Sequence, residues 1–407
     1  MKDPVTAISG ITYDRESIER WLFKSSTNNT ICPVTKQPLP RDSDLTPNHT
    51  LRRLIQAWCS VNATNGVDRI PTPKPPLSKF HVINLIRDLY VPDLQMKTLQ
   101  KLEALAAENE RNRVFMVEAG LIKALVSFIV SCYENSEKKG VEEALSLFYL
   151  VNRTSIGQST GILTENEKII IESLIWVLDC FHGNVVVKTH AMCLMKVLIQ
   201  KANPRLLERL NPEFFRIILS NLRPESGISQ QGIVSLLHIL LDTCPWGRNG
   251  VVLVELGAIF DLIELELRNR PPEKKTTELV LGILYHLCSC ADGRAQLLNH
   301  TAGIAVVTRR ILKVSSMADE RAIFIIWLIS KYCGTNGVLE EMVRVGTVAK
   351  LCMVMQANCG VHLKEKAKEI LRTHSDVWKD SPCSEAATLT SSSDFLVFAV
   401  FHLAFNI

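Results

Sequence analysis

The chain of 407 residues is poor in aromatic side chains and lacks the short motifs that mark common catalytic sites. Aromatic residues make up only 6% of it, whereas 47% of its residues are hydrophobic, which favours Leu, Ile and Val packed between helices. It contains no H-E-x-x-H motif, no phosphate-binding loop of the Walker type and no G-x-G-x-x-G fingerprint, which argues against a zinc protease or a nucleotide-binding enzyme. A net charge of +4 without a basic cluster argues against nucleic acid as a partner.

Cysteine is present but not in the spacing of metal sites or disulfide frameworks. The twelve cysteines are scattered and no C-x-x-C occurs, which indicates free thiols in a reducing compartment. His286, Cys288, Cys290 and His300 lie close in sequence, but the two cysteines fall on different faces of a predicted helix and are expected to pack in a core. We therefore expect no metal and no cofactor, and a cytoplasmic location, with the nucleus and the membrane surface left open.

A proline-rich stretch divides the chain. Residues 61–79 contain Pro71, Pro73, Pro75 and Pro76, a density that forbids a helix and favours an extended spacer. We predict a first domain at 1–60, a linker at 61–79, a helical region at 80–380 and a disordered tail at 381–407. The last fourteen residues, 394–407, are apolar but fall short of the roughly 20 that cross a bilayer, so stable membrane insertion is not expected.

The helical region repeats with a period in the forties. An apolar helix opened by Gly or Asn recurs at separations of 46, 45, 46, 46 and 43 residues. The opening positions are Gly120, Asn166, Asn211, Gly257, Gly303 and Gly346. This period is typical of armadillo and HEAT arrays, in which each unit buries its apolar face against its neighbours. We predict an armadillo/HEAT-type α-solenoid, so that the fold is mostly α.

Two helices are predicted inside the first domain. Asp14 is expected to accept hydrogen bonds from the first turn of one helix, in which Ile18, Trp21 and Leu22 form a buried stripe. Asn48 is expected to cap the second helix. Its apolar residues are predicted to share one face and are Leu51, Leu54, Ile55 and Trp58. The candidates for a polar network that holds the domain together are Asp14, Arg15, Glu16, Asn48 and Arg53.

Zinc cannot hold this first domain together. A cross-braced RING domain needs eight Cys or His ligands, and residues 1–60 offer only Cys32, Cys59 and His49. The domain nevertheless carries a connected pattern: Met-Lys-Asp-Pro-Val at 1–5, Gly-Ile-Thr-Tyr-Asp-Arg-Glu-Ser-Ile-Glu-Arg-Trp-Leu at 10–22, Cys-Pro-Val-Thr-Lys-Gln-Pro-Leu at 32–39 and a closing run at 45–59. That pattern resembles the U-box of ubiquitin ligases, which keeps the RING shape without zinc as a small α+β domain.

The resemblance implies catalysis without a covalent nucleophile. A U-box docks a conjugating enzyme (E2) charged with ubiquitin and favours a conformation of the thioester that a lysine can attack, so its contribution is positioning. By resemblance the E2-binding residues are Trp21, Pro33, Val34 and Lys36. From the residues alone three other interpretations stay open: Trp21 as a core residue, Pro33 as a turn stiffener and Lys36 as an ordinary solvated lysine.

The pairing of a U-box with an armadillo array resembles the plant U-box ligases. The resemblance implies substrate selection through the solenoid groove and transfer of ubiquitin for proteasomal degradation, in stress or immune signalling. Self-association is also typical of U-boxes. A nuclear importer is disfavoured, because the residues four positions after Trp176, Trp246 and Trp327 are not asparagine.

The pattern begins late, which leaves a second hypothesis open. U-boxes normally carry a Cys-Pro-Ile-type segment about ten residues before the element that starts here at Met1, and that segment supplies the first docking loop. We therefore expect this chain to dock E2 weakly, or its start to be internal to a longer protein. The alternative function is an inactive adaptor, or dominant competitor, that binds substrates without recruiting E2.

Overall fold

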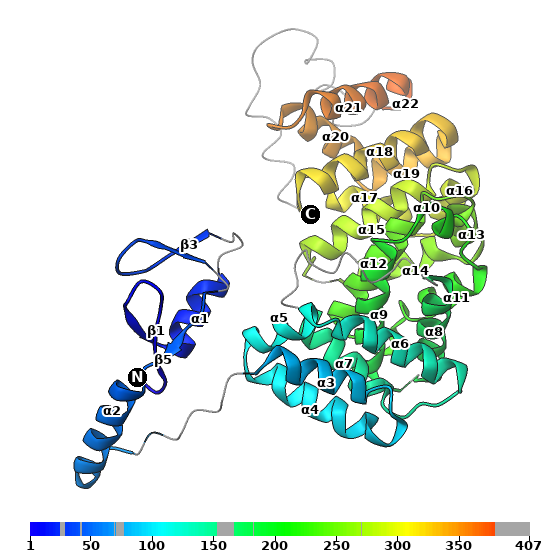
Figure 1. The fold of residues 1–407 in the computed structure, drawn as a ribbon. Coiled ribbons are helices and arrows are strands. Elements are labelled where there is room, and N and C mark those ends of the chain that lie inside the picture. Colours follow the sequence, from blue (N-terminus) through cyan, green and yellow to red (C-terminus); the bar gives the residue numbers. More distant parts are fainter. Residues whose placement is uncertain are drawn as a thin grey trace. The chain divides into compact units, whose positions relative to one another are not determined.

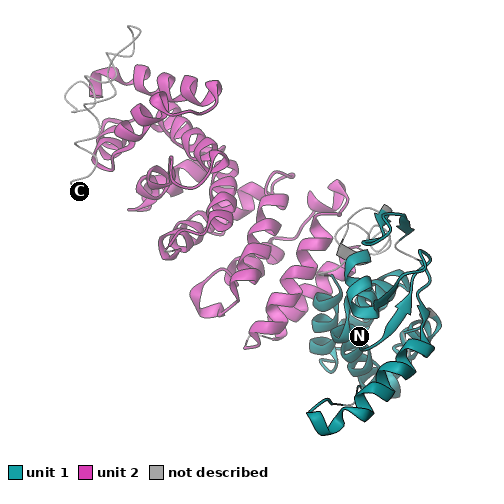
Figure 2. Cartoon of the chain, turned by 90° about the vertical axis from the view of Figure 1, so that its left-hand side faces the viewer, with its two compact units in different colours: residues 1–164 teal, residues 165–407 magenta. Residues whose placement is uncertain are grey.

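The computed structural model describes residues 1–24, 29–40, 43–68, 70, 77–152, 167–181, 183–269 and 271–378. It divides into two compact units, residues 1–164 and 165–407 (Figure 2). Residues 71–76, which carry the prolines of the predicted linker, and the predicted tail at 381–407 lie outside the described residues. The fold is mostly helical with a small β-containing first domain, as predicted.

The first domain combines short strands with two helices (Figure 1). Its elements are β1 (Pro4–Thr6), β2 (Thr12–Asp14), α1 (Arg15–Lys24), β3 (Asn29–Ile31), β4 (Pro38–Pro40), β5 (Thr46–Pro47), α2 (His49–Val61) and the 3₁₀ turn η1 (Ala63–Asn65). One antiparallel sheet has the order β2-β1-β5, and β3 pairs with β4 in a separate hairpin. In the first sheet Pro4 lies opposite Asp14 and Thr6 opposite Thr12, which brings the start of the chain beside the start of α1.

The core of this domain is small. Its cluster of buried hydrophobic residues consists of Val5, Ala7, Ile18, Leu22, Cys32 and Leu39. Of the stripe predicted on α1, Ile18 and Leu22 are buried, but Trp21 is 46% exposed. The prediction that this whole stripe is buried was therefore wrong at Trp21.

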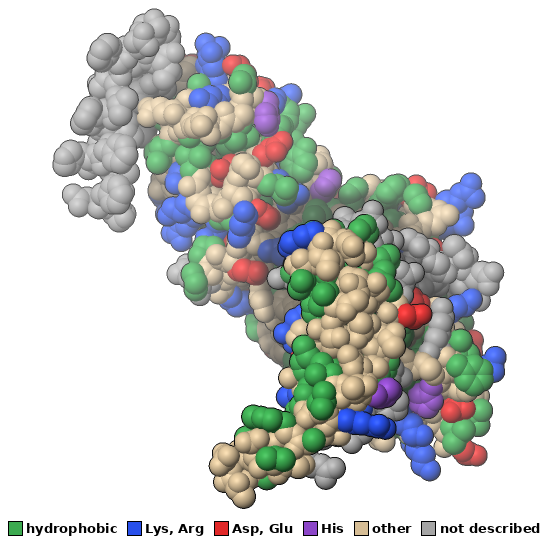
Figure 3. Space-filling model, turned by 60° about the vertical axis from the view of Figure 1, so that its left-hand side comes forward, with side chains coloured by type: hydrophobic (Ala, Val, Ile, Leu, Met, Phe, Trp, Pro, Cys, Tyr) green, Lys and Arg blue, Asp and Glu red, His purple; other side chains and the backbone are tan. Residues whose placement is uncertain are grey.

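The apolar face predicted on α2 is largely uncovered by the core. Leu54 is 63% exposed and Trp58 59% exposed, and Cys59 is the buried residue of this helix. A core of this size covers only part of a helix: Leu51 and Ile55 are partly buried, whereas Leu54 and Trp58 lie beyond it. Figure 3 shows hydrophobic side chains along this projecting helix.

The remaining helices form the solenoid. In the first unit they are α3 (Lys79–Asp88), η2 (Pro92–Leu94), α4 (Gln95–Glu108), α5 (Glu110–Glu118), α6 (Leu121–Glu134) and α7 (Val141–Asn152). In the second unit they are α8 (Glu167–Cys180), α9 (Val185–Ile199), α10 (Pro204–Leu207), α11 (Pro212–Ser220), η3 (Pro224–Ser226), α12 (Gln230–Thr243), α13 (Asn249–Glu255), α14 (Ala258–Arg268), α15 (Lys274–Leu287), α16 (Ala291–Asn299), α17 (Gly303–Arg310), α18 (Ser316–Cys333), α19 (Asn336–Arg344), α20 (Thr347–Gln356), α21 (Val361–Thr373) and α22 (Ser375–Trp378).

The third helix of each armadillo-type repeat stacks on the third helix of the next repeat. In the second unit α9, α12, α15, α18 and α21 pack successively against one another, so they form one row (Figure 1). Each helix buries its apolar side against its neighbours, so no single repeat forms a hydrophobic core by itself. In the described part of the chain no single helix is long and apolar enough to cross a membrane. Taken together, α5 and α6 are long and apolar enough to do so, but the pair is bent by 70° at the break between the two helices.

The residues predicted to begin the repeated apolar helices differ in their backbone conformation and in how they cap those helices. Gly120, Gly257 and Gly346 cap α6, α14 and α20 with φ of 88°, 81° and 80°, in the left-handed region that glycine adopts without strain. Gly303 has no such conformation and begins α17, where a Cβ atom would lie 2.0 Å from the carbonyl oxygen of Leu297. Asn211 caps α11 through its side chain, and Asn166 lies outside the described residues.

Candidate functional site

The start of the chain is fixed to α1 by a charged network. Asp14 Oδ1 accepts hydrogen bonds from the backbone N–H groups of Lys2 (2.7 Å) and Asp3 (2.8 Å). Arg15 Nε donates to Asp3 Oδ2 at 2.6 Å, and its NH1 lies 3.6 Å from Glu19 Oε1. We predicted that Asp14 bonds to the first turn of α1. Instead it ends β2, and the β1–β2 pairing places these two amides beside its carboxylate.

Asn48 connects α2 to the sheet. As predicted, it caps this helix, with Oδ1 accepting from Leu51 N at 3.0 Å. Its Nδ2 donates to Thr12 Oγ1 at 3.2 Å, and Thr12 Oγ1 also lies 2.9 Å from Thr6 Oγ1. One side chain therefore satisfies the helix end and joins it to β1 and β2.

Two of the predicted network residues lie elsewhere. Glu16 forms a pair with Arg20 at 2.7 Å, in which both side chains are 73% exposed, so it contributes little to stability. Arg53 is an exposed residue of α2. The partners that the sequence did not reveal, Asp3 and Glu19, are reached only through the sheet register and the helix spacing.

The segment between β3 and β4 is held by Cys32, which is completely buried. Its sulfur lies 2.9 Å from Tyr13 Oη and accepts from Thr35 N at 3.4 Å. Its backbone N–H donates to Gln37 O at 2.8 Å, and its carbonyl accepts from Lys36 N at 3.0 Å. Lys36 has a φ of 59°, so the chain turns here through a conformation uncommon for a residue with a side chain.

Hydrogen bonds decide the charge preference of Cys32. Burial raises the pKa of the thiol, but hydrogen-bond donors around the sulfur, Tyr13 and Thr35 among them, outweigh burial and lower that pKa to about 6. Burial and the hydrogen bond to Cys32 in turn raise the pKa of Tyr13 to about 12. The Cys32 sulfur therefore accepts hydrogen bonds as a thiolate near neutral pH, and the Tyr13 hydroxyl stays protonated and donates to it.

An exposed apolar surface lies on the outside of this tied segment. Trp21 Nε1 donates to Ile31 O at 3.0 Å, which links α1 directly to the end of β3. Ile31 is 49% exposed and Val34 61% exposed, beside the 46% exposed Trp21. The predicted residues Pro33, Val34 and Lys36 all lie on the turn that follows Ile31, with Pro33 partly buried and Lys36 exposed. We call Trp21, Ile31, Pro33, Val34 and Lys36 the docking surface.

Large hydrophobic side chains normally avoid this degree of exposure when they are contiguous, so the surface fits a protein partner. Ile31 was not among the predicted residues. The available signal was its place directly before the Cys-Pro pair, where a strand ends at the surface.

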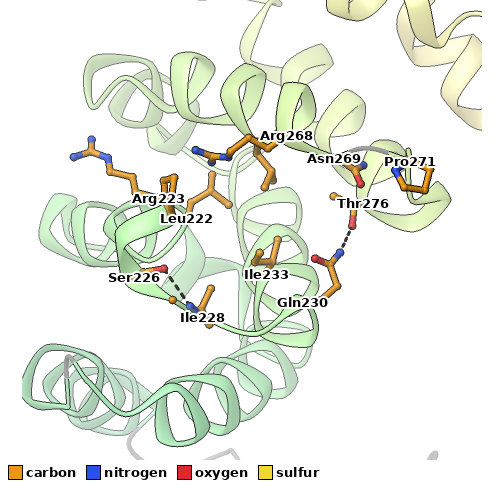
Figure 4. A pocket seen from close by; sticks show the side chains of 13 residues that line it. Leu222, Arg223, Ser226, Ile228, Gln230, Ile233, Arg268, Asn269, Pro271 and Thr276 are labelled. Atoms are coloured by element: carbon orange, nitrogen blue, oxygen red, sulfur yellow. Dashed lines mark hydrogen bonds between the residues drawn. The ribbon is translucent and has the colours of Figure 1, made fainter.

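The second unit holds a pocket of about 310 Å³ (Figure 4). It lies between the η3–α12 segment and the α14–α15 connection, and Arg223 and Arg268 are among its lining residues. Arg223 Nε lies 3.4 Å from Asp261 Oδ1, and Gln230 Nε2 donates to Thr276 Oγ1 at 2.9 Å. Burial raises the pKa of Asp261, and Arg223 opposes that shift. The pocket contains neither a nucleophile paired with a base nor a metal-ligand set.

The described residues contain no group of three or more His, Cys, Asp or Glu side chains that could hold a metal ion. His300 lies 3.3 Å from Glu264, and Cys288 is a buried core residue, so the four residues 286, 288, 290 and 300 form no such group within the described chain.

Comparison with known proteins assigns both regions. Residues 1–64 match the family model of the U-box domain, and residues 81–394 match that of the plant U-box protein ARM repeat region. The chain is 45% identical to the E3 ubiquitin-protein ligase PUB24 of Arabidopsis thaliana, over 96% of this chain and 92% of that protein. It is 42% identical to the E3 ubiquitin-protein ligase PUB23 of the same plant, over 94% of this chain and 92% of that protein.

Solved structures support the solenoid fold alone. A chain from a study of the interaction between cadherin and beta-catenin superposes with a TM-score of 0.61 at 12% identity, covering 83% of this chain and 61% of that one. The crystal structure of an engineered protein superposes with a TM-score of 0.54 at 13% identity, covering 77% of this chain and 75% of that one.

Proposed function

The chain belongs to the plant U-box E3 ubiquitin ligases with an ARM repeat region, and we propose that it docks a ubiquitin-charged E2 on the docking surface of its first domain. The observation that carries this proposal is the hydrogen bond from Trp21 Nε1 to Ile31 O, which holds an exposed indole beside the exposed turn of Pro33 and Val34. An apolar surface fixed before binding loses little conformational entropy when a partner covers it.

The chemistry supplied by the U-box is positioning. Trp21 and Val34 provide the apolar centre of the contact, and Lys36 adds a positive charge at its edge, where it suits an acidic group of E2 or ubiquitin. The E2 carries the thioester, and the substrate lysine is the nucleophile. The ligase lowers the barrier by restricting the thioester to a conformation that this lysine can attack.

The solenoid selects the substrate in this proposal. Its stacked helices offer a long surface that repeats at each unit, which suits an extended or helical protein segment. Ubiquitin transfer then marks the substrate for proteasomal degradation, in plant stress or immune signalling and in the cytoplasm. PUB24 and PUB23, which resemble the chain over most of its length, are named as E3 ligases and support the reaction class.

The test is ubiquitin transfer with the purified chain, an activating enzyme, a set of E2 enzymes and ubiquitin. Val34→Asp places a charge at the centre of the docking surface and is expected to reduce the rate by roughly tenfold or more, since burying an unpaired charge costs several kcal/mol. Leu54→Asp is the matched control, because Leu54 is 63% exposed and Val34 61% exposed.

Equal losses in the two variants would contradict the docking surface. Absence of transfer with every E2, together with retained binding of substrate, would instead support the inactive adaptor.

A further inference from the structure

The pocket of the second unit has the size and lining of a small-molecule site. Its volume of about 310 Å³ lies at the lower end of the range in which proteins hold small ligands. The η3–α12 segment forms one wall, and the end of α14 with the α14–α15 connection forms the other (Figure 4). These walls belong to two adjacent repeats, so a ligand in the pocket contacts both of them.

One part of the lining is apolar. Leu222 and Leu265 are buried, and Ile228 and Ile233 are partly buried, so the pocket removes part of their surface from the core without covering it with another side chain. An apolar body placed against these side chains leaves water, which favours binding in proportion to the area that it covers.

The other part of the lining is cationic. Arg223 and Arg268 line the pocket, and none of its described lining residues is acidic. Arg268 is an exposed residue in the last turn of α14 and forms no ion pair with another described residue. Both guanidinium groups act electrostatically on Asp261, and Figure 4 shows them at the same end of the pocket.

The neighbouring carboxylates leave this charge incompletely paired. Arg223 Nε lies 3.4 Å from Asp261 Oδ1, which is longer than the roughly 2.7–2.9 Å of a strong charge-assisted hydrogen bond, and the Arg223 side chain is 56% exposed. Glu225 also acts on Asp261, but neither of the two acidic residues lines the pocket. A carboxylate inside the pocket can therefore form the short guanidinium contacts that Asp261 does not.

A third cation lies behind the η3 wall. Lys188 of α9 is only 4% exposed, and its Nζ donates to Ser226 O at 3.4 Å, where Ser226 is a lining residue. Burial lowers the pKa of this amine, and none of the ion pairs among the described residues involves it. An anion in the pocket would stabilise its charged form across this wall.

Hydrogen bonds hold the two walls together before a ligand enters. Gln230 Nε2 donates to Glu273 Oε2 at 2.6 Å and to Thr276 Oγ1 at 2.9 Å, which joins the start of α12 to the start of α15. Asn269 Oδ1 accepts from Glu273 N at 3.1 Å and fixes the α14–α15 connection. A site that is formed in advance loses little conformational entropy on binding.

From this lining we propose that the pocket binds a small amphiphilic acid, with its carboxylate at Arg223 and Arg268 and its aromatic or aliphatic body against the apolar wall. That wall is formed by Ile228, Ile233 and Leu265. A bare oxyanion would leave the apolar wall uncovered, and a neutral hydrocarbon would leave the guanidinium groups without a partner. The site goes beyond ubiquitin transfer and does not depend on the E2 contact.

The test uses the full chain and two probes that share one apolar body, phenylbutyrate and phenylbutanol. Dissociation constants are measured by ligand-observed NMR titration. The acid is expected to bind about tenfold more tightly than the alcohol, because only its carboxylate forms charge-assisted hydrogen bonds to the guanidinium groups. High salt should reduce this preference, since the arginine side chains are exposed.

Arg268→Gln removes one guanidinium group and keeps a polar side chain. It is expected to weaken phenylbutyrate by about fivefold to tenfold and to leave phenylbutanol unchanged. Arg248→Gln is the matched control, because Arg248 is also exposed and does not line the pocket. Ile233→Trp fills the apolar part and should abolish binding of both probes, with circular dichroism confirming that the helices remain folded.

Equal weakening by the two arginine substitutions, or equal binding of acid and alcohol, would overturn the inference. Binding of phenylbutyrate that survives Ile233→Trp would place the probe elsewhere and would contradict it as well. Displacement by an equal concentration of inorganic phosphate would indicate a bare oxyanion site instead. A peptide that ends in Phe is the last arm: tighter binding than phenylbutyrate, lost on amidation of its carboxylate, would replace the small acid by a protein C-terminus.

Discussion

At the scale of single residues, the contact between Tyr13 and Cys32 links separate elements of the first domain. It joins β2 to the turn between β3 and β4 through one contact of 2.9 Å. The thiol has a pKa of about 6 in the fold and 9.0 in ordinary surroundings, so its deprotonation favours the folded domain. This stabilisation is complete above about pH 9 and is lost as the pH falls towards 6.

Tyr13→Phe removes the donor without changing the ring. We expect a loss of about 1 kcal/mol in the stability of the first domain near neutral pH, with a weaker dependence of that stability on pH between 6 and 9, because the thiolate loses one of its donors. Hydrogen exchange of the amides in β1, β2 and β4 measures both effects. Glu16→Gln, at an exposed pair on α1, should leave exchange unchanged. A Tyr13→Phe protein with the original pH profile would contradict the assignment.

At the scale of secondary-structure elements, a buried ion pair fixes the packing of α14, α15 and α17. Glu266 is completely buried, and its Oε1 lies 2.6 Å from Arg310 Nε and accepts from Thr277 Oγ1 at 2.7 Å. Burial raises the pKa of Glu266, while the hydroxyl and the guanidinium oppose that rise. The Glu266 carboxylate thus connects three helices that belong to two adjacent repeats.

Arg310→Met would leave Glu266 buried without its cation. We expect a loss of about 3–5 kcal/mol in the unfolding free energy of the solenoid, because breaking one side of a buried pair leaves an uncompensated charge. Arg216→Met is the control: its pair with Glu213 is exposed, and the expected effect is below about 1 kcal/mol. Denaturant unfolding followed by circular dichroism gives both values. Similar midpoints for the two variants would show that the pair is not structural.

The elements also show what sequence reasoning could reach. Local patterns predicted the helices, the repeat and the cap formed by Asn48, because neighbours in sequence determine these features. The backbone amides that donate to Asp14 depend on the β1–β2 register, and the exposure of α2 depends on how small the core beneath it is. Neither feature can be predicted from neighbouring residues. Periodicity identifies an apolar face, but it does not say whether another element covers that face. Leu54 and Trp58 are exposed for this reason, and Ile31 escaped prediction because its role comes from the hydrogen bond of Trp21.

At the scale of the whole molecule, the first domain and the solenoid have separate hydrophobic cores. The buried residues of the first domain form one cluster of their own. In the solenoid each unit contacts mainly its neighbours, so stability is close to a sum of local terms. Unfolding is therefore expected to proceed in steps, and a single free energy does not describe the chain.

Arg310→Met is expected to accelerate hydrogen exchange in α12 to α18 and to leave β1, β2 and α1 unchanged. Tyr13→Phe should show the reverse pattern. Peptide-resolved exchange of the two proteins under one condition distinguishes local from global effects. Uniform acceleration along the chain in either variant would mean that the two cores unfold as one cooperative unit.

The exposed position of Trp21, held by its hydrogen bond to Ile31 O, has a consequence for the fluorescence of the chain. Of the six tryptophans, Trp21 and Trp58 are the strongly exposed ones, and both belong to the first domain. An indole in water emits at longer wavelength than one in an apolar contact, so a partner that covers Trp21 shifts the emission of the chain to the blue. With Trp58→Phe as background, the remaining exposed indole is Trp21 on the docking surface. The protein thus carries its own spectroscopic label at the place where the E2 is proposed to bind, and titration needs no dye.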